Sequence, residues 1–192
     1  MKMNCQFVRK AWIKRSVYMI LLFIGSCMEA QVINVSGNWN ATIPPITEAG
    51  SNYAGTYDNS GSTGTNQIIL SGTLPGSFLN LLSSSGAKMT MRYTPNPWNN
   101  SLTLSAKRTG GTTTINGVCL FCTSAINGGT TYIPISQTSD TTLLTFNFTG
   151  VLGLNNSVAF ADINLILQLA GVSVTVPANT YSARIVFTIV AN

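Results

Sequence analysis

Residues 181–191 read YSARIVFTIVA, and every second side chain in this stretch is apolar or small. Successive side chains of a β-strand point to opposite faces of a sheet, so this alternation predicts a strand with one buried face. The set expected to face inward is Tyr181, Ala183, Ile185, Phe187, Ile189 and Ala191. The stretch therefore predicts the closing strand of a β-sheet fold.

The same alternation recurs at the other end of the chain, over residues 33–43. Its apolar or small positions are Ile33, Val35, Gly37, Trp39, Ala41 and Ile43. Pro44 and Pro45 follow, and proline ends a strand because it lacks the N–H donor of the sheet ladder. Residues 33–43 are therefore predicted to form the first strand.

Further strands are expected between these two ends. Alternating or apolar runs occupy residues 67–70, 88–93, 101–106, 131–135, 143–149 and 163–176. The triplet Thr109-Gly110-Gly111 is expected to close the strand that precedes it. Seven to ten strands, turn-rich connections and no helical pattern predict a single antiparallel β-sandwich, with a closed β-barrel as the alternative.

Residues 1–30 have the order of charge and hydropathy found in signal peptides. Five basic residues precede an apolar run over residues 17–24, and the small residues Gly25 and Ser26 follow it. Two endings stay open: cleavage before Cys27, which would then carry a lipid anchor, or cleavage after Ala30. Either ending predicts an exported domain over residues 31–192, located in the periplasm, on the outer membrane surface or outside the cell.

The exported part of the chain is almost uncharged. Residues 31–192 contain five basic and four acidic residues, which leaves a net charge near +1. Only Lys107 and Arg108 are adjacent, so the clustered basic surface that nucleic-acid binding needs is missing. The apolar run over residues 163–176 is broken by polar residues, and no transmembrane segment is expected after the leader.

The chain contains no histidine, which removes Ser-His-Asp and Cys-His catalysis and the commonest metal ligand. The sequence predicts no cofactor and no metal site. An enzyme using the paired acids Asp140 and Asp162 is the weakest hypothesis, because turn capping and a solvated strand face explain these residues without catalysis.

Cys119 and Cys122 are the only cysteines after residue 30, and they have C-x-x-C spacing. Zinc would require further Cys or His ligands. A redox role would require a helix start in a βαβ unit, which the surrounding Thr, Gly and Asn residues do not favour. A structural disulfide in an oxidising compartment is the preferred interpretation.

The C-terminal segment 176–190, with its Thr180-Tyr181 pair and alternating strand, resembles the closing strand of spore coat protein U domains, which belong with archaic chaperone–usher pilins. The segment 33–43 is similar to a pilin donor strand, with a small residue at Gly37. The resemblance implies an immunoglobulin-like or pilin-like sandwich. It also implies assembly by donating the strand of one subunit to the next.

Two functions are expected from these observations. The first is a non-enzymatic structural or adhesive module of the bacterial cell envelope, whose partners are other envelope or fibre subunits. The alternative is a carbohydrate- or small-ligand-binding sandwich that uses loop aromatics such as Trp98, because aromatic rings stack on sugars.

Overall fold

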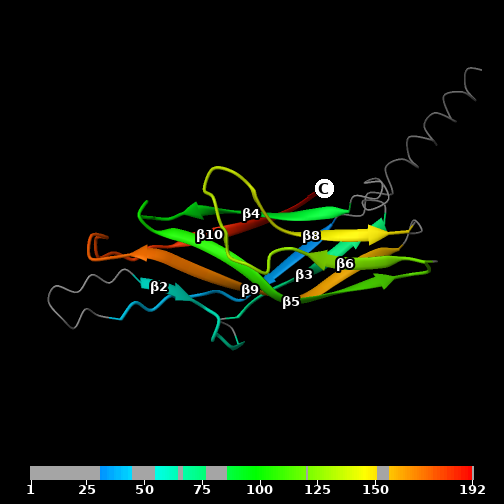
Figure 1. Cartoon of the computed structure of the whole chain (residues 1–192), viewed down its shortest axis with the longest axis horizontal. Coiled ribbons are helices and arrows are strands. Elements are labelled where there is room, and N and C mark those ends of the chain that lie inside the picture. The colour runs from blue at the N-terminus through cyan, green and yellow to red at the C-terminus, as the bar shows by residue number, and fades with distance from the viewer. Residues whose placement is uncertain are drawn as a thin grey trace, which may run out of the picture. The chain divides into compact units, whose positions relative to one another are not determined.

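The computed structural model describes residues 31–44, 55–64, 67–76, 86–119, 121–150 and 156–191. These residues form two antiparallel β-sheets, seen as upper and lower layers in Figure 1. The first sheet has the order β1-β3-β9-β5-β7, with β2 also paired to β9, and comprises β1 (Val32–Ser36), β2 (Gly55–Asp58), β3 (Ile68–Pro75), β5 (Thr103–Asn116), β7 (Ile133–Pro134) and β9 (Ser157–Val172). The second has the order β10-β4-β8-β6 and comprises β4 (Ala87–Pro95), β6 (Thr123–Asn127), β8 (Thr141–Thr149) and β10 (Ala183–Ala191).

The hydrophobic core lies between the two sheets. Phe160 of β9 and Phe146 of β8 meet across it, with ring centroids 4.8 Å apart. The side chains buried most completely come from both sheets: Leu70, Leu74, Met89, Met91, Leu143, Leu144, Phe160, Ile163 and Leu165. The all-β expectation is confirmed. The described strands form two separate sheets rather than one closed sheet, so the barrel alternative is wrong.

Alternation in the sequence placed most of the strands correctly. β4, β8 and β10 coincide closely with the runs expected at residues 88–93, 143–149 and 181–191. β9 extends over Ser157–Val172, so it begins before the predicted stretch and ends before Val174. The leader, residues 1–30, lies outside the described residues. The part of the chain that the structure describes contains no helix long and apolar enough to cross a bilayer.

The Gly110-Gly111 pair does not end a strand, contrary to the sequence expectation. β5 continues through it to Asn116 and pairs with β9 on both sides of it. Gly110 and Gly111 have positive φ angles of 64° and 103°, and Asp162 of β9 has a φ of 56°. Both long strands therefore bend at the same level, which glycine permits without the steric cost of a side chain.

The bend brings the second half of β5 against β6 of the other sheet. The Thr113 hydroxyl donates to the Ser124 carbonyl oxygen at 3.2 Å, and the Ser124 hydroxyl donates to Thr113 Oγ1 at 2.9 Å. The Arg108 guanidinium donates to the carbonyl oxygens of Gly128, Gly110 and Ile126 at 2.6, 2.7 and 3.1 Å. These bonds join the two sheets on this side.

The opposite side of the first sheet contains a gap in strand pairing. β2 and β3 pair with different parts of the same edge of β9. The pairing of β2 ends with Asp58 opposite Gln168, and the pairing of β3 begins with Ile68 opposite Leu165. Asn59 lies in the gap. Its side-chain oxygen accepts from Leu167 N at 2.6 Å, and its side-chain nitrogen donates to the Leu165 carbonyl oxygen at 3.4 Å.

Candidate functional site

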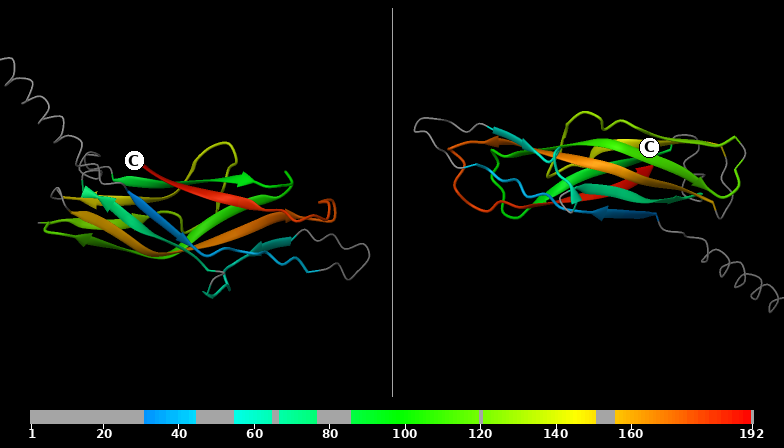
Figure 2. Two further views of the ribbon diagram at one scale, coloured as in Figure 1. Left: turned by 180° about the vertical axis from the view of Figure 1, so that it is seen from behind. Right: turned by 90° about the horizontal axis from the view of Figure 1, so that it is seen from below.

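The first strand, β1, forms one edge of the first sheet (Figure 2). It pairs with β3 from Val32 opposite Thr73 to Ser36 opposite Ile69. Gly72, opposite Ile33, permits this close approach, because a Cβ there would collide with the Val32 carbonyl oxygen and the Phe160 ring. The absence of a side chain at Gly72 therefore leaves room for β1 beside β3.

The side chains of β1 are poorly buried. Val32 and Val35 are 47% and 51% exposed, although Val35 lies opposite the fully buried Leu70. Of the strand's side chains, Ile33 packs against the core. Partial burial of one aliphatic side chain contributes on the order of 1–2 kcal/mol. The strand is therefore held mainly by its ladder with β3.

Strand pairing ends early in the alternating segment. β1 stops at Ser36, and Gly37 follows with a positive φ of 89°. The described residues 37–44 form no strand, although Trp39 packs against the core and Ile43 is 39% exposed. The remainder of the predicted first strand, residues 37–43, therefore has the alternating sequence of a strand without its pairing.

The closing strand, β10, forms one edge of the second sheet, and β6 forms the other. Within the described part of the chain it pairs with β4, from Ala183 opposite Pro95 to Ala191 opposite Ala87. Ile189 is buried, while Ile185 and Phe187 pack half-buried against the core. Tyr181 lies before the strand, and its hydroxyl donates to the Pro177 carbonyl oxygen at 2.7 Å.

The two edge strands approach each other at one point. Gln31 Nε2 donates to the Ile189 carbonyl oxygen at 3.2 Å, so β1 begins beside the free side of β10. Charged side chains usually discourage edge-to-edge association, and these two strands have few of them. β1 has no charged residue, and β10 has Arg184 as its single one. Among the described residues, the edges formed by β1 and β10 therefore carry one charged side chain between them and meet at Gln31.

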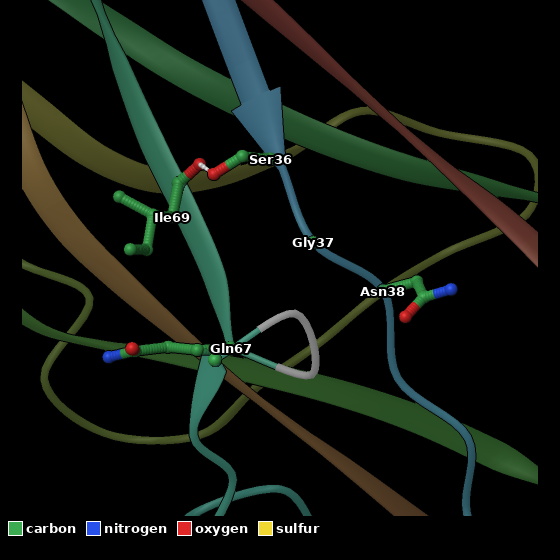
Figure 3. Close-up of a pocket in the computed structure, with 6 residues that line it drawn as sticks. Ser36, Gly37, Asn38, Gln67 and Ile69 are labelled. Carbon is green, nitrogen blue, oxygen red and sulfur yellow. Dashed lines mark hydrogen bonds between the residues drawn. The ribbon is translucent and has the colours of Figure 1, made fainter.

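A shallow, open pocket of about 580 Å³ lies where β1 leaves β3. Ser36, Gly37 and Asn38 line it on one side, and Gly64, Gln67 and Ile69 on the other. The Ser36 hydroxyl donates to the Ile69 carbonyl oxygen at 3.4 Å. Figure 3 shows the amides of Gln67 and Asn38 pointing in opposite directions, so these groups do not converge on one point as in a ligand pocket.

Asp58, Tyr132 and Lys107 form a polar cluster at the surface of the first sheet. Tyr132 Oη donates to Asp58 Oδ2 at 3.0 Å, and Lys107 Nζ lies 4.4 Å from the centre of the Tyr132 ring. Hydrogen bonds from the Ser60 hydroxyl and backbone N–H lower the pKa of Asp58, and burial together with Asp58 raises that of Tyr132. No local pattern in the sequence indicates this cluster, because Asp58 lies 74 residues from Tyr132 in the chain.

The residues proposed for the alternative functions have other partners. Trp98 Nε1 donates to the Leu102 carbonyl oxygen at 3.0 Å, and its ring lies 5.3 Å from that of Tyr93. This half-buried indole therefore packs at the rim of the core. Asp140 lies 3.7 Å from Arg92, and Asp162 occupies the bend of β9. Within the described residues, no three Cys, Asp or Glu side chains are grouped as a metal site requires.

Cys119 and Cys122 form a disulfide in the turn between β5 and β6, with their Cα atoms 5.7 Å apart. Both cysteines are half-buried against the edge of the core. Their neighbours Val118 and Phe121 are 86% and 96% exposed. Cys27, the expected lipid-bearing residue, lies outside the described residues.

Comparison with known proteins gives no relative from which a role could be transferred. No protein-family model, curated protein or solved structure matches this chain.

Proposed function

We propose that this protein is a non-enzymatic structural or adhesive module of the bacterial cell envelope that assembles into fibres by donating its first strand, residues 31–43, to a neighbouring copy. Its sandwich is then of the immunoglobulin-like or pilin-like kind. The observation that carries the proposal is the state of β1, a neutral edge strand whose valines remain half exposed.

Exchange of β1 between copies preserves its contacts. In the described chain β1 pairs with β3 of its own domain, and in a fibre the same residues would pair with β3 of the next copy. Because the contacts are the same, the free-energy difference between the single copy and the fibre depends mainly on the connecting segment and the protein concentration. Residues 37–44, which form no strand, supply that connection.

A donated strand can also gain pairing that β1 lacks within its own chain. The alternation of residues 33–43 continues beyond Ser36, where β1 now ends. Main-chain hydrogen bonds to a free sheet edge provide affinity in strand addition, and alternate side chains provide specificity. Each copy both donates and accepts, and such head-to-tail contacts produce open filaments unless the ring closes.

Two further observations support an exported location. Residues 1–30 have the charge and hydropathy order of a leader. The disulfide between Cys119 and Cys122 suits an oxidising compartment outside the cytoplasm.

A disulfide lock between β1 and β3 tests the proposal. Asn34 lies opposite Ser71, so the double variant Asn34→Cys/Ser71→Cys ties β1 to its own domain. We expect the unmodified protein to give high-mass species in size-exclusion chromatography and the locked variant to stay monomeric. The matched control, Thr94→Cys/Arg184→Cys, ties β10 to β4 and leaves β1 free, so it should still assemble.

Deletion of residues 31–43 provides the complementary measurement. The shortened chain should not assemble alone, but it should bind a synthetic peptide of residues 31–43. An unmodified protein that is monomeric at all concentrations would refute strand donation, as would a locked variant that assembles as well as the control.

A further inference from the structure

The turn between β5 and β6 presents two large apolar side chains to solvent. It lies at the end of the sandwich seen at the right of Figure 1, between Asn116 and Thr123. Val118 is 86% exposed and Phe121 is 96% exposed. The Cys119–Cys122 disulfide lies half-buried against the core. The bridge therefore anchors the turn, from which both side chains project.

Phe121 is also held in an unfavourable backbone conformation. Its φ is 59°, in the left-handed region that suits Gly or Asn and is disfavoured for a bulky side chain. The turn is further fixed by Asn156 Nδ2, which donates to the Val118 carbonyl oxygen at 2.6 Å. Because the phenyl ring of Phe121 is 96% exposed, it gains little packing energy to offset this backbone strain. Such local strain is typical of functional positions.

The surroundings of the turn indicate what contacts it. No charged residue occurs anywhere from residue 109 to residue 139. Burying this segment away from water therefore incurs no cost of desolvating a charged side chain within it. A projecting, uncharged pair of apolar side chains fits the boundary between the headgroups and acyl chains of a lipid bilayer, where apolar side chains are buried to a shallow depth.

We infer that the Val118–Phe121 turn inserts into the surface of a lipid bilayer and is a membrane-contact site of this protein. The site does not depend on donation of β1, because it lies on the β5–β6 turn and uses neither β1 nor β10. Two side chains bury little area, so one copy binds weakly and reversibly. Several copies held together would bind much more strongly through their combined contacts.

Flotation with vesicles of phosphatidylcholine tests the site. The full exported protein should float with the vesicles, and Phe121→Ser should lower its partition coefficient by about tenfold to a hundredfold, the effect of removing one buried aromatic side chain. Val118→Ser should lower it by a smaller factor. The matched control is Val174→Ser, because Val174 is 54% exposed and follows the Val172 end of β9, whereas the turn follows Asn116, which pairs with Ser157 at the other end of β9.

The variant Phe121→Trp locates the contact independently of any other membrane anchor. Its added fluorescence should shift to shorter wavelength with vesicles and be quenched by brominated lipid, while Val174→Trp should show neither effect. Because both positions are exposed, circular dichroism of all variants should match the unmodified protein. Failure of the unmodified protein to float, equal loss in Val174→Ser, a requirement for anionic lipid, or no response of Trp at position 121 would each overturn the inference.

Discussion

The side chain of Asn59 makes hydrogen bonds to β9 in the gap between β2 and β3, where neither of these two strands pairs with β9. Between the end of β2 and the start of β3, its amide contacts Leu167 N and the Leu165 carbonyl oxygen, and its own backbone N–H donates to the Leu167 carbonyl oxygen at 3.3 Å. Asn59 is 5% exposed, so water cannot easily take over these bonds. An amide side chain suits the position because it offers both a donor and an acceptor.

Replacing this side chain should therefore destabilise the domain. Asn59→Ala leaves one buried N–H and one buried carbonyl without their partner, and we expect the free energy of unfolding to fall by about 2–4 kcal/mol. Urea denaturation measures the change. Asn127→Ala, at an exposed position of β6, is the control and should change stability by less than about 0.5 kcal/mol. Equal midpoints for the two variants would contradict this role of Asn59.

Asp58 should make stability depend on acid pH. Hydrogen bonds from the Ser60 hydroxyl and N–H, and then from Tyr132, hold its pKa below the ordinary value of 3.8. A carboxyl whose pKa is lower in the folded state stabilises that state above its unfolded pKa, and the contribution is lost as pH falls through the folded value. Asp58→Asn should thus be less stable than the unmodified protein at pH 6, with the gap closing below about pH 4.

Unfolding free energies measured between pH 2.5 and pH 7 test this dependence. Because the cluster lies at the surface, the gap at neutral pH should be small, and salt should reduce it. The control is Asp140→Asn at the exposed pair with Arg92. A gap for Asp58→Asn that stays constant across this pH range would refute the assignment.

Among the elements, β5 shows how one long strand can contact both sheets. β5 pairs with β9 over its whole length, bends at Gly110 and Gly111, and then packs against β6. A Cβ at Gly111 would lie 2.9 Å from Ile163 Cγ1 and 3.1 Å from Ile126 Cδ1. The bend therefore requires both a positive φ and an absent side chain at this residue.

Gly111→Ala should accordingly destabilise the domain by about 1–3 kcal/mol, through the left-handed backbone and the crowding of Ile163. The matched control is Gly61→Ala, because no atom lies within 4 Å of a Cβ at Gly61 and its φ is not positive. Thermal or urea unfolding of both variants gives the comparison. A Gly111→Ala variant as stable as Gly61→Ala would show that the bend does not depend on this glycine.

The sequence predicted the elements whose pattern is local. Alternation located β4, β8 and β10, because one buried and one exposed face produce a period of two. It failed at Gly110-Gly111, because a glycine pair marks a turn as readily as a bend within a strand. It also failed beyond Ser36, where an alternating segment remains unpaired. Pairing depends on a neighbour that is distant in sequence, and alternation carries no information about that neighbour.

The candidate sites also differ in whether a local pattern in the sequence indicates them. The spacing of Cys119 and Cys122 is a local feature that the sequence shows directly. The exposure of Phe121 depends on how the turn folds, so the sequence does not indicate it. Asn59 and the contact between Asp58 and Tyr132 join residues 74 or more positions apart, so nothing near them in the sequence indicates their roles.

At the scale of the whole molecule, the scarcity of charge is the property that most affects association. Residues 31–192 carry a net charge near +1, and neither β1 nor β10 has an acid. Natural sheets usually protect free edges with charged side chains, lysine above all, because like charges oppose edge pairing. In the proposed fibre the absence of this protection is what allows one copy to approach another.

Assembly through neutral edges should therefore be insensitive to salt. We expect the association rate of the unmodified protein, followed by light scattering, to differ by less than about twofold between 20 and 500 mM NaCl, since there is little repulsion to screen. Asn34→Lys/Ser36→Lys places two charges on β1 and should slow association at 20 mM NaCl, with recovery at 500 mM. The variant Asn34→Gln/Ser36→Thr controls for changed size at the same positions. A strong salt dependence of the unmodified protein would mean that association is driven by charge elsewhere on the surface, and strand donation would then lose its physical basis.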